Sequence, residues 1–574
     1  MSGREQRTPN ARAWLTLSLL FVTTATAAPR FRSVRHPAPP PHIIEVTAEP
    51  PACALTPLAQ VTCDGAPSLT PSEVDAIVRA AAKSLSDDTL TIAVVDRAGR
   101  PLALYRKPSA NPLNDDAAVG VARTAAFFSH NMAPLSSRTV RFLSGIHFPP
   151  GITNTPSAAL YGIENTNRGC DFNVAFNAGK CIPRARRVGG AQCDSSDPSG
   201  CSSGIVTGKQ LPNDADASSV NAGGIPLYRV SVDGPRVFGG KLLGAIGVAG
   251  AGGDSQRAEY AAVTGAFGAL ATAIAPVPAY PLPNPGNVFI DGIRLPFLGD
   301  DLRLTFASNG IPNGVTLKGA TAGSDNGAFA IAPQFGGCAA DEYLVGPLAG
   351  SQLSVLEVDA IVQRAVATAK KTRAAIRLPL NSFARMVISV ADTDGSILAL
   401  YRMPDATIFS IDVSVAKSRN VVYFSGAGIG GALPANHAVS NRTIGFGAQP
   451  FFPPGIDSGV FNAGPGPWYQ SLFVFDLAHP CTQGNQPLNP NQNGVVFFAG
   501  SSPLYRGTQL IGGLGVSGDG IEQDDYVTYF GAGEFLPAQT LWADQVTVDG
   551  VRLPMFKFPR QPEGVKECGG GPCS

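Results

Sequence analysis

The stretch LTIAVVDRAGRPLALYR, residues 90–106, decides the fold of this chain, and it returns as MVISVADTDGSILALYR at residues 386–402. Each version has a run rich in β-branched residues, a turn with aspartate and glycine, and a second apolar run that ends in Tyr-Arg. Apolar runs around an Asp/Gly turn predict a β-hairpin. The chain therefore contains the same hairpin twice.

The duplication extends over most of the chain. Further matched pairs follow in the same order: EVDAIV at 73–78 and 357–362, PPGI at 149–152 and 453–456, PLYR at 226–229 and 503–506, and Asp-Gly-hydrophobic-Arg-Leu-Pro at 291–296 and 549–554. The distance between the partners is far above the roughly 20–50 residues of a repeat array. We therefore expect two copies of one domain.

Helical segments accompany each hairpin. Thr70 with Glu73, and Ser354 with Glu357, form capping boxes that predict the start of a first helix in each copy. A second helix, a glycine-rich strand and a final helix follow, at 116–129, 239–250 and about 254–271 in copy one and at 412–425, 508–518 and about 522–533 in copy two. Since a hairpin replaces βαβ crossovers, the class is α+β: two homologous domains, each a central antiparallel β-sheet flanked by helices.

The expected organisation has six parts. They are a signal peptide (1–28), a proline-rich leader (29–66), a first domain (67–298, copy one), a linker (299–350), a second domain (351–558, copy two) and a tail (559–574). Each domain carries a long insertion rich in glycine and asparagine, about 153–221 in the first and about 457–500 in the second. Such a composition predicts loops rather than core elements.

The N-terminus has the pattern of an export signal. Three arginines up to Arg12 precede an apolar run from Trp14 to Val22, and Ala25-Thr26-Ala27 resembles a cleavage site. We therefore expect a periplasmic or extracellular protein. No later segment is apolar enough over its length to predict a membrane span.

Ten cysteines in an exported chain predict disulfides. All of them lie outside the matched segments, in the leader, the insertions, the linker or the tail. This distribution favours structural staples of long loops over a catalytic thiol. Their pairing stays open.

Several functions are disfavoured by composition and motifs. Lys+Arg and Asp+Glu both total 43, so the chain lacks the basic excess of a nucleic-acid binder. The glycine-rich strands lack the Gly-Lys-Ser/Thr ending of a phosphate loop and the βαβ context of a dinucleotide fold. No Ser/His/Asp motif and no metal-spaced set of cysteines and histidines appears, so we nominate no catalytic residue and no metal site.

Taken together, the motifs resemble the GlcG/HbpS-like family of haem-binding proteins. The matches are 69–73, 94–106, 122–125 and 244–250 in copy one, and 353–357, 390–403, 416–417, 513–518 and 523–524 in copy two. The resemblance implies α+β domains that assemble into oligomers. It also implies haem as a cofactor, with roles in haem degradation or redox sensing in some members.

Haem would need an apolar slot, cations for its propionates and an axial ligand. Tyr105 with Arg106, and Tyr401 with Arg402, recur at the end of the hairpin. Under the resemblance they would supply a phenolate and a propionate partner. An edge tyrosine beside a surface ion pair explains them equally well, and both interpretations stay open.

Further candidates lie on the second helix and in loops. Arg123 and Arg419 recur on that helix, where an arginine would meet an anionic ligand or an acidic side chain. The resemblance adds the helix-motif positions Thr124 and Lys417, neither of which is kept in the other copy. The axial-ligand candidates by residue type are His130, His147 and His437. An ordinary loop histidine is the alternative for each.

Three hypotheses follow. The first is an exported tandem protein that binds haem or a related anionic tetrapyrrole, with a haem-degrading or redox-sensing role. The second is a non-catalytic structural or interaction module, in which the duplication reproduces a family dimer within one chain and the stapled insertions make the partner surface; a homo-oligomer is the other expected assembly. The third is an enzyme acting on a small metabolite.

Overall fold

The computed structural model describes most of both predicted domains. The described residues are 68–144, 159–163, 166, 220–233, 236–269, 274–276, 288–290, 293–307, 312–336, 345–379, 381–429, 433–454, 464–479, 482–484, 491–563, 567–568 and 571–572. Residues 57–574 belong to one compact unit.

Copy one is built around an antiparallel sheet with strand order β10-β2-β1-β4-β3-β5. Its helices are α1 (Pro71–Lys83), α2 (Asn114–Phe128), α3 (Ser137–Ser144) and α4 (Ser255–Gly268). Its strands are β1 (Thr91–Asp96), β2 (Pro101–Arg106), β3 (Gly224–Asp233), β4 (Arg236–Ala249), β5 (Ile274–Ala275) and β10 (Ala328–Ile331). Short hairpins β6/β7 (Phe289–Ile290, Ile293–Arg294) and β8/β9 (Leu302–Phe306, Pro312–Leu317) complete it.

Copy two repeats the four central strands in the order β12-β11-β14-β13. Its helices are α5 (Val355–Ala369), α6 (Phe409–Ala427), α7 (Asn441–Gly447), α9 (Phe475–Ala478) and α10 (Ile521–Ala532), with a π-helical turn η7 (Tyr469–Val474). Its strands are β11 (Val387–Ala391), β12 (Ile397–Arg402), β13 (Ser501–Arg506) and β14 (Gln509–Ser517). Two pairs of two-residue strands follow: β15 (Thr547–Val548) with β16 (Val551–Arg552), and β17 (Glu567–Cys568) with β18 (Gly571–Pro572).

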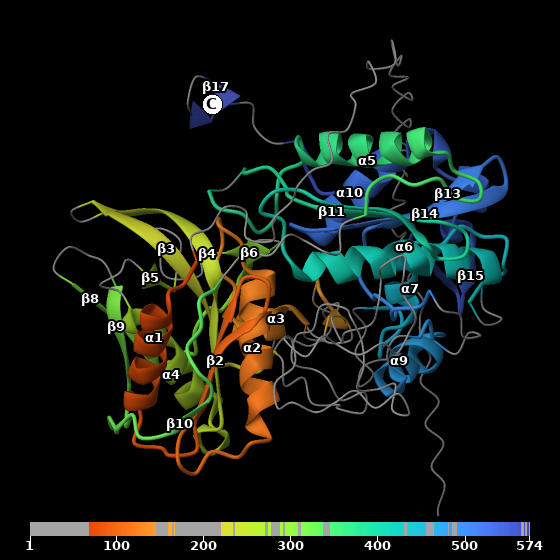
Figure 1. The fold of residues 1–574 in the computed structure, drawn as a ribbon. Coiled ribbons are helices and arrows are strands. Elements are labelled where there is room, and N and C mark those ends of the chain that lie inside the picture. The colour runs from red at the N-terminus through yellow and green to blue at the C-terminus, as the bar shows by residue number, and fades with distance from the viewer. Residues whose placement is uncertain are drawn as a thin grey trace, which may run out of the picture. The chain divides into compact units, whose positions relative to one another are not determined.

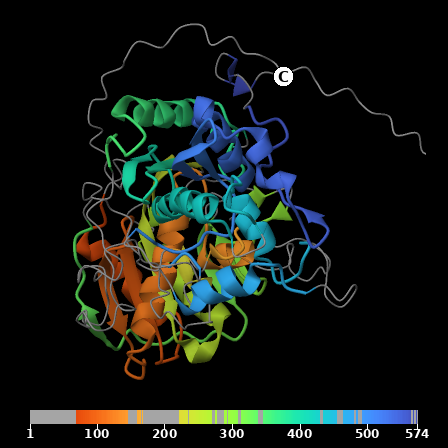
Figure 2. The same ribbon diagram turned by 90° about the vertical axis from the view of Figure 1, so that its right-hand side faces the viewer.

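Each domain has three layers. Helices α1 and α4 cover one face of the first sheet and α2 the other (Figure 1). Helices α5 and α10 repeat the first arrangement in copy two, and the second sheet separates them from α6 (Figure 2). The prediction of two α+β domains with antiparallel sheets is confirmed.

Local chemistry explains the shared frame. Both capping boxes are present, with the side chain of Thr70 or Ser354 accepting a hydrogen bond from the backbone three residues on. The glycines of the central strand allow close helix packing: a Cβ at Gly247 would lie 2.1 Å from the carbonyl of Ala118 on α2. A Cβ at Gly515 would meet α6 at the same distance. These glycines therefore serve packing rather than phosphate binding.

The structure adds a matching strand to each predicted domain, beside the glycine-rich strand. The sequence assigns no strand to the PLYR segments, but they lie in β3 and β13, which pair with the glycine-rich strands. Proline is tolerated in a strand where no ladder hydrogen bond is needed from its nitrogen. These two strands were not predicted, because their segments contain proline and few β-branched residues.

The predicted linker, 299–350, contributes to both sheets. Strand β10 pairs with β2 at the edge of copy one. Val345 exchanges backbone hydrogen bonds with Leu400 of β12, so the end of the same segment covers the matching edge of copy two. Covering an edge strand in this way removes a site for unwanted strand pairing.

The second insertion differs from its prediction as a loop. Its residues Trp468, Leu472, Val495 and Phe497 are buried and join a core with Phe424 of α6. Apolar side chains spaced among glycine and asparagine are enough to build this third cluster. The cysteines lie outside the part of the chain whose side chains are described, so the disulfide prediction stays a prediction. Within the described residues, no helix is long and apolar enough to cross a membrane.

Candidate functional site

Tyr105 and Arg106 have partners within the protein. The Tyr105 hydroxyl donates to the backbone carbonyl of Asp325, and its ring meets Phe329 of β10 edge-on at 4.9 Å. Burial raises the pKa of Tyr105, which disfavours the phenolate form. Arg106 forms an ion pair with Asp115, with Nε 2.8 Å from Oδ1. In copy one, therefore, Tyr105 and Arg106 both make contacts that hold the end of strand β2 in place.

The counterparts in copy two are arranged differently. Tyr401 is half-buried against the core, and Arg402 is buried. Arg402 Nε donates to the carbonyl of Ala406 at 3.0 Å. This contact closes the turn that follows β12.

The recurring helix arginines share one structural contact. Arg123 Nε lies 2.8 Å from the carbonyl of Gly99, and Arg419 Nε lies 2.8 Å from that of Gly395. Both glycines have φ near +80°, the left-handed region that a tight hairpin turn uses. Each arginine therefore ties the second helix of its domain to its hairpin turn.

Lys417 is fully buried on α6. Its Nζ lies 2.9 Å from the carbonyl of Val516, 3.0 Å from Oδ2 of Asp524 and 5.0 Å from the ring centre of Phe498. Burial lowers the pKa of Lys417 and raises that of Asp524 to about 7.

Copy one has neither of these charges. Val121 stands at the position of Lys417 and Ala258 at that of Asp524, so an apolar pair replaces the ion pair. The neighbouring helix-motif residue Thr124 is also fully buried. These helix positions therefore face the interior of each domain.

The predicted histidines are separated. His147 lies outside the described residues. His437 is half-buried in the loop before α7, where its backbone N–H donates to the carbonyl of Pro434. His130 is fully buried, directly after α2.

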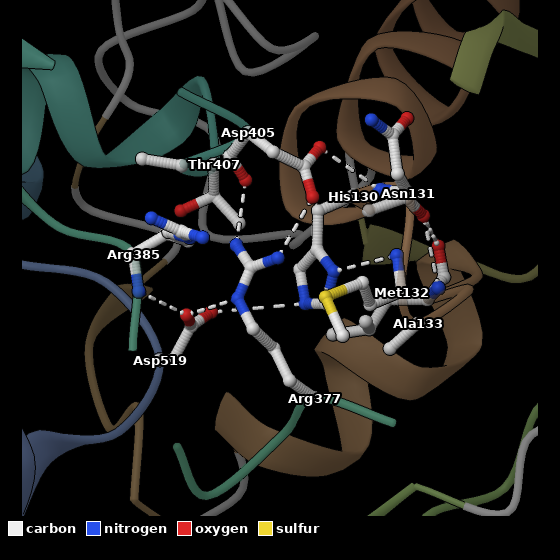
Figure 3. Close-up of polar contacts among 12 residues, drawn as sticks. His130, Asn131, Met132, Ala133, Arg377, Arg385, Asp405, Thr407 and Asp519 are labelled. Atoms are coloured by element: carbon white, nitrogen blue, oxygen red, sulfur yellow. Dashed lines mark hydrogen bonds and ion pairs between the residues drawn. The ribbon is translucent and has the colours of Figure 1, made fainter. Parts of the chain in front are cut away.

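His130 belongs to a charged cluster where the two copies meet (Figure 3). Its Nε2 lies 3.7 Å from Oδ1 of Asp519. Arg377 bridges Asp519 and Asp405, with Nη1 2.7 Å from Asp405 Oδ2. Arg97 from copy one reaches Asp405 Oδ1 at 2.9 Å.

The protonation states in this cluster follow from burial and charge. Burial and the positive charge of Arg377 lower the pKa of His130 well below its usual value, so the ring is neutral. The Met132 N–H donates to Nδ1, which places the proton on Nε2, facing Asp519. Burial acts to raise the pKa of Asp405, but the charge of Arg377 outweighs it and holds that pKa below its usual value. The cluster therefore contains two guanidinium groups and two carboxyl groups around a neutral imidazole.

A groove of about 850 Å³ lies on copy one, away from that cluster. The Asp-Gly-hydrophobic-Arg-Leu-Pro motif at 291–296 (the closing motif) supplies Arg294 and Pro296, and Phe297 follows it. Helix α3 supplies Arg138, and β8 supplies Arg303. The walls combine polar and apolar surface; the apolar part includes Phe142, Phe297 and the exposed ring of Phe306, and Asp300 adds one carboxylate to the lining. Three guanidinium groups therefore border an apolar surface.

The three arginines differ in their partners. Arg138 Nε pairs with buried Glu259 at 2.8 Å. Arg303 donates from Nη1 to the backbone carbonyls of Asp300 and Leu302. Arg294 is exposed, its backbone pairs with Phe289 in the β6/β7 hairpin, and its guanidinium makes no hydrogen bond or ion pair with another described residue. Two cationic charges thus remain without a described carboxylate partner at the groove.

Copy two has the same two arginine positions, but both of its arginines form ion pairs. Arg442 pairs with Asp525 as Arg138 does with Glu259. Arg552, the counterpart of Arg294, instead forms an ion pair with Asp544 at 2.6 Å. At this position, therefore, copy two has an arginine paired with a carboxylate, and copy one has an arginine without a described carboxylate partner.

None of the residues nominated from the sequence lines the groove. The signal that points to it is the repeated Asp-Gly-hydrophobic-Arg-Leu-Pro motif, which contains Arg294 and Arg552. An arginine kept in both copies at an exposed position is a candidate for binding, but the motif contributed to the prediction only as evidence for the duplication.

Comparison with known proteins adds a family. The profile of the family described as "Haem degrading protein HbpS-like" matches residues 69–265 and 354–532. A Klebsiella pneumoniae protein, ORFY, is similar in structure, with 19% identity, 31% of this chain and 88% of that chain covered, and a TM-score of 0.20. The structure of a PduOC:heme complex has 21% identity, covers 32% of this chain and 94% of that chain, and has a TM-score of 0.21. No curated protein matches. The two family matches span both domains, and the chain belongs to the HbpS-like family as two tandem copies.

Proposed function

We propose that this protein binds haem or a related anionic tetrapyrrole, and that the groove on copy one holds it. The observation that carries the proposal is the joining of apolar walls with Arg294 and Arg303 in one groove. Membership of a family described by haem degradation supports the ligand class.

The groove lining offers two kinds of group that suit the periphery of a haem. Phe142, Phe297 and Phe306 offer ring surfaces for an apolar macrocycle, and the guanidinium groups of Arg294 and Arg303 suit carboxylates. Arg138 is neutralised by Glu259, so it contributes hydrogen bonding more than net charge.

An axial ligand is not found among the described lining residues. They include no histidine, cysteine, methionine or tyrosine. Bound haem would supply an iron centre, and the described residues would hold its carboxylates and faces. Binding is therefore the proposed role, and haem degradation or redox sensing would require a further group at the iron.

A haemin titration of the purified mature chain tests the proposal. We expect a saturable Soret band, and a weaker affinity in Arg294→Ala and Arg303→Ala variants. Arg552→Ala is the matched control, because it removes the equivalent arginine of copy two from an exposed pair with Asp544. A wild-type protein that is folded but gives no saturable band at micromolar concentration would contradict the proposal.

We further propose that the chain is exported, on the strength of its signal-like N-terminus. Expression of the full chain with N-terminal sequencing of the secreted product is the test. A mature form that starts near residue 28 supports export, and an unprocessed chain retained in the cytoplasm contradicts it.

The second candidate function is a non-catalytic interaction module. The buried contact between the copies favours it, since it resembles a subunit interface within one chain. A folded chain that fails to bind haemin, but loses a protein partner when residues 153–221 are deleted, would support this alternative.

A further inference from the structure

The contact between the copies joins unlike ends of equivalent helices. The end of α2 in copy one meets the start of α6 in copy two, where Phe128 stacks on Phe409 with ring centres 3.9 Å apart. The Ile408 N–H donates to the carbonyl of Phe127 at 3.0 Å. Because α6 is the counterpart of α2, this contact is heterologous, the type that builds rings or filaments when it repeats.

Buried charge surrounds the apolar contact. Asp405 of copy two accepts hydrogen bonds from Arg97 and from the backbone N–H of Asn131, both in copy one. Arg377 connects Asp405 with Asp519, and Asp519 faces His130 of copy one (Figure 3). The side chains of Arg97 and Arg377 are fully buried, so each depends on these carboxylates.

The equivalent outward surfaces lack these groups. Ser109 stands in copy one where copy two has Asp405, and Thr393 stands in copy two where copy one has Arg97. Gly426 takes the place of His130. Leu113, the counterpart of Phe409, is 84% exposed. The charges therefore occur only on the two surfaces that face each other.

Arg377 lies in a segment that only copy two possesses. Residues 370–386 connect α5 to β11, whereas residues 84–90 make the same connection in copy one. Copy one therefore has no side chain equivalent to Arg377 that could bind a second copy of this chain. A repeat of the contact between two chains would bury an apolar pair without any of the ion pairs.

We infer that this charged contact is an exclusive joint between the two copies of one chain. Copy one contributes Arg97, His130 and Asn131 to the contact. Copy two contributes Asp405, Arg377 and Asp519. The chain is thus a self-limited head-to-tail pair, and it does not extend into a longer assembly through the same contact.

Hydrogen exchange of the full mature chain tests the joint. In Asp405→Ser, which installs the residue of copy one, we expect amides in 127–132 and 405–409 to exchange about tenfold faster or more, as loss of one charged hydrogen bond implies. Amides of β1 and β11 should keep their protection. Asp405→Asn retains the side-chain shape and serves if the serine variant does not fold. Unchanged exchange at the joint in both variants would overturn the inference.

Light scattering tests exclusivity. Leu113→Asp should have the same mass as the wild type over the full range of concentration, because the outward surface does not pair in this way. A wild-type mass that rises with concentration and returns to that of one chain in Leu113→Asp would overturn the inference.

Discussion

The buried pair of Lys417 and Asp524 provides a test of the energetics within one chain, because copy one has Val121 and Ala258 at the same positions. Both charged side chains are almost completely buried. Replacing one member leaves the other charge without its partner, and such a loss costs about 3–5 kcal/mol. We therefore expect Lys417→Met or Asp524→Val alone to lower the free energy of unfolding of copy two by that amount.

The double variant should behave differently. Replacing a buried ion pair by apolar residues of similar volume is often neutral or stabilising by about 1–4 kcal/mol. Lys417→Met combined with Asp524→Val should therefore recover most of the loss seen in the single variants. Urea unfolding followed by fluorescence measures each free energy, and the double-mutant cycle gives the coupling. A double variant that loses the sum of the two single losses would refute this reasoning.

Three further results are expected. The free energy of unfolding of the wild type should fall relative to the double variant as pH rises from about 4 to about 7. The reason is that burial raises the pKa of Asp524 to about 7, so the folded state keeps a proton that the unfolded chain releases; parallel pH profiles in urea would contradict it. Asp405→Asn should lower the free energy of unfolding by about 3–5 kcal/mol, because two buried guanidinium groups lose their shared carboxylate. Asp544→Asn, in the exposed pair with Arg552, should lower it by less than about 1 kcal/mol. Equal losses in chemical unfolding would argue against the buried cluster. Arg123→Met and Arg419→Met should each lower the free energy of unfolding by about 1–3 kcal/mol, since each leaves a buried carbonyl of the hairpin turn without its hydrogen-bond donor. Markedly unequal losses would argue against a shared role.

Local patterns predicted the frame of each domain well. The capping boxes, the hairpins and the glycine-rich strands all depend on neighbouring residues and on a period that is visible in the chain. Strands β3 and β13 were missed because proline and polar residues interrupt the β-branched pattern there.

The charged joint was beyond sequence reasoning for a different reason. His130 was nominated by residue type, but its partners Arg377, Asp405 and Asp519 come from distant segments. Nothing in their local sequence marks them as neighbours. The groove depended in the same way on tertiary structure, since α3, the closing motif and β8 meet only after folding.

The most direct test of the account is the affinity of haemin for wild-type protein, for an Arg294→Ala/Arg303→Ala variant and for Arg552→Ala. A charged hydrogen bond contributes about 1.5–3 kcal/mol, so loss of both groove arginines should weaken binding at least about tenfold. Arg552→Ala should bind as the wild type does. Equal affinity of the wild type and the double variant, with both proteins folded, would contradict the assignment of the groove on copy one as the tetrapyrrole site.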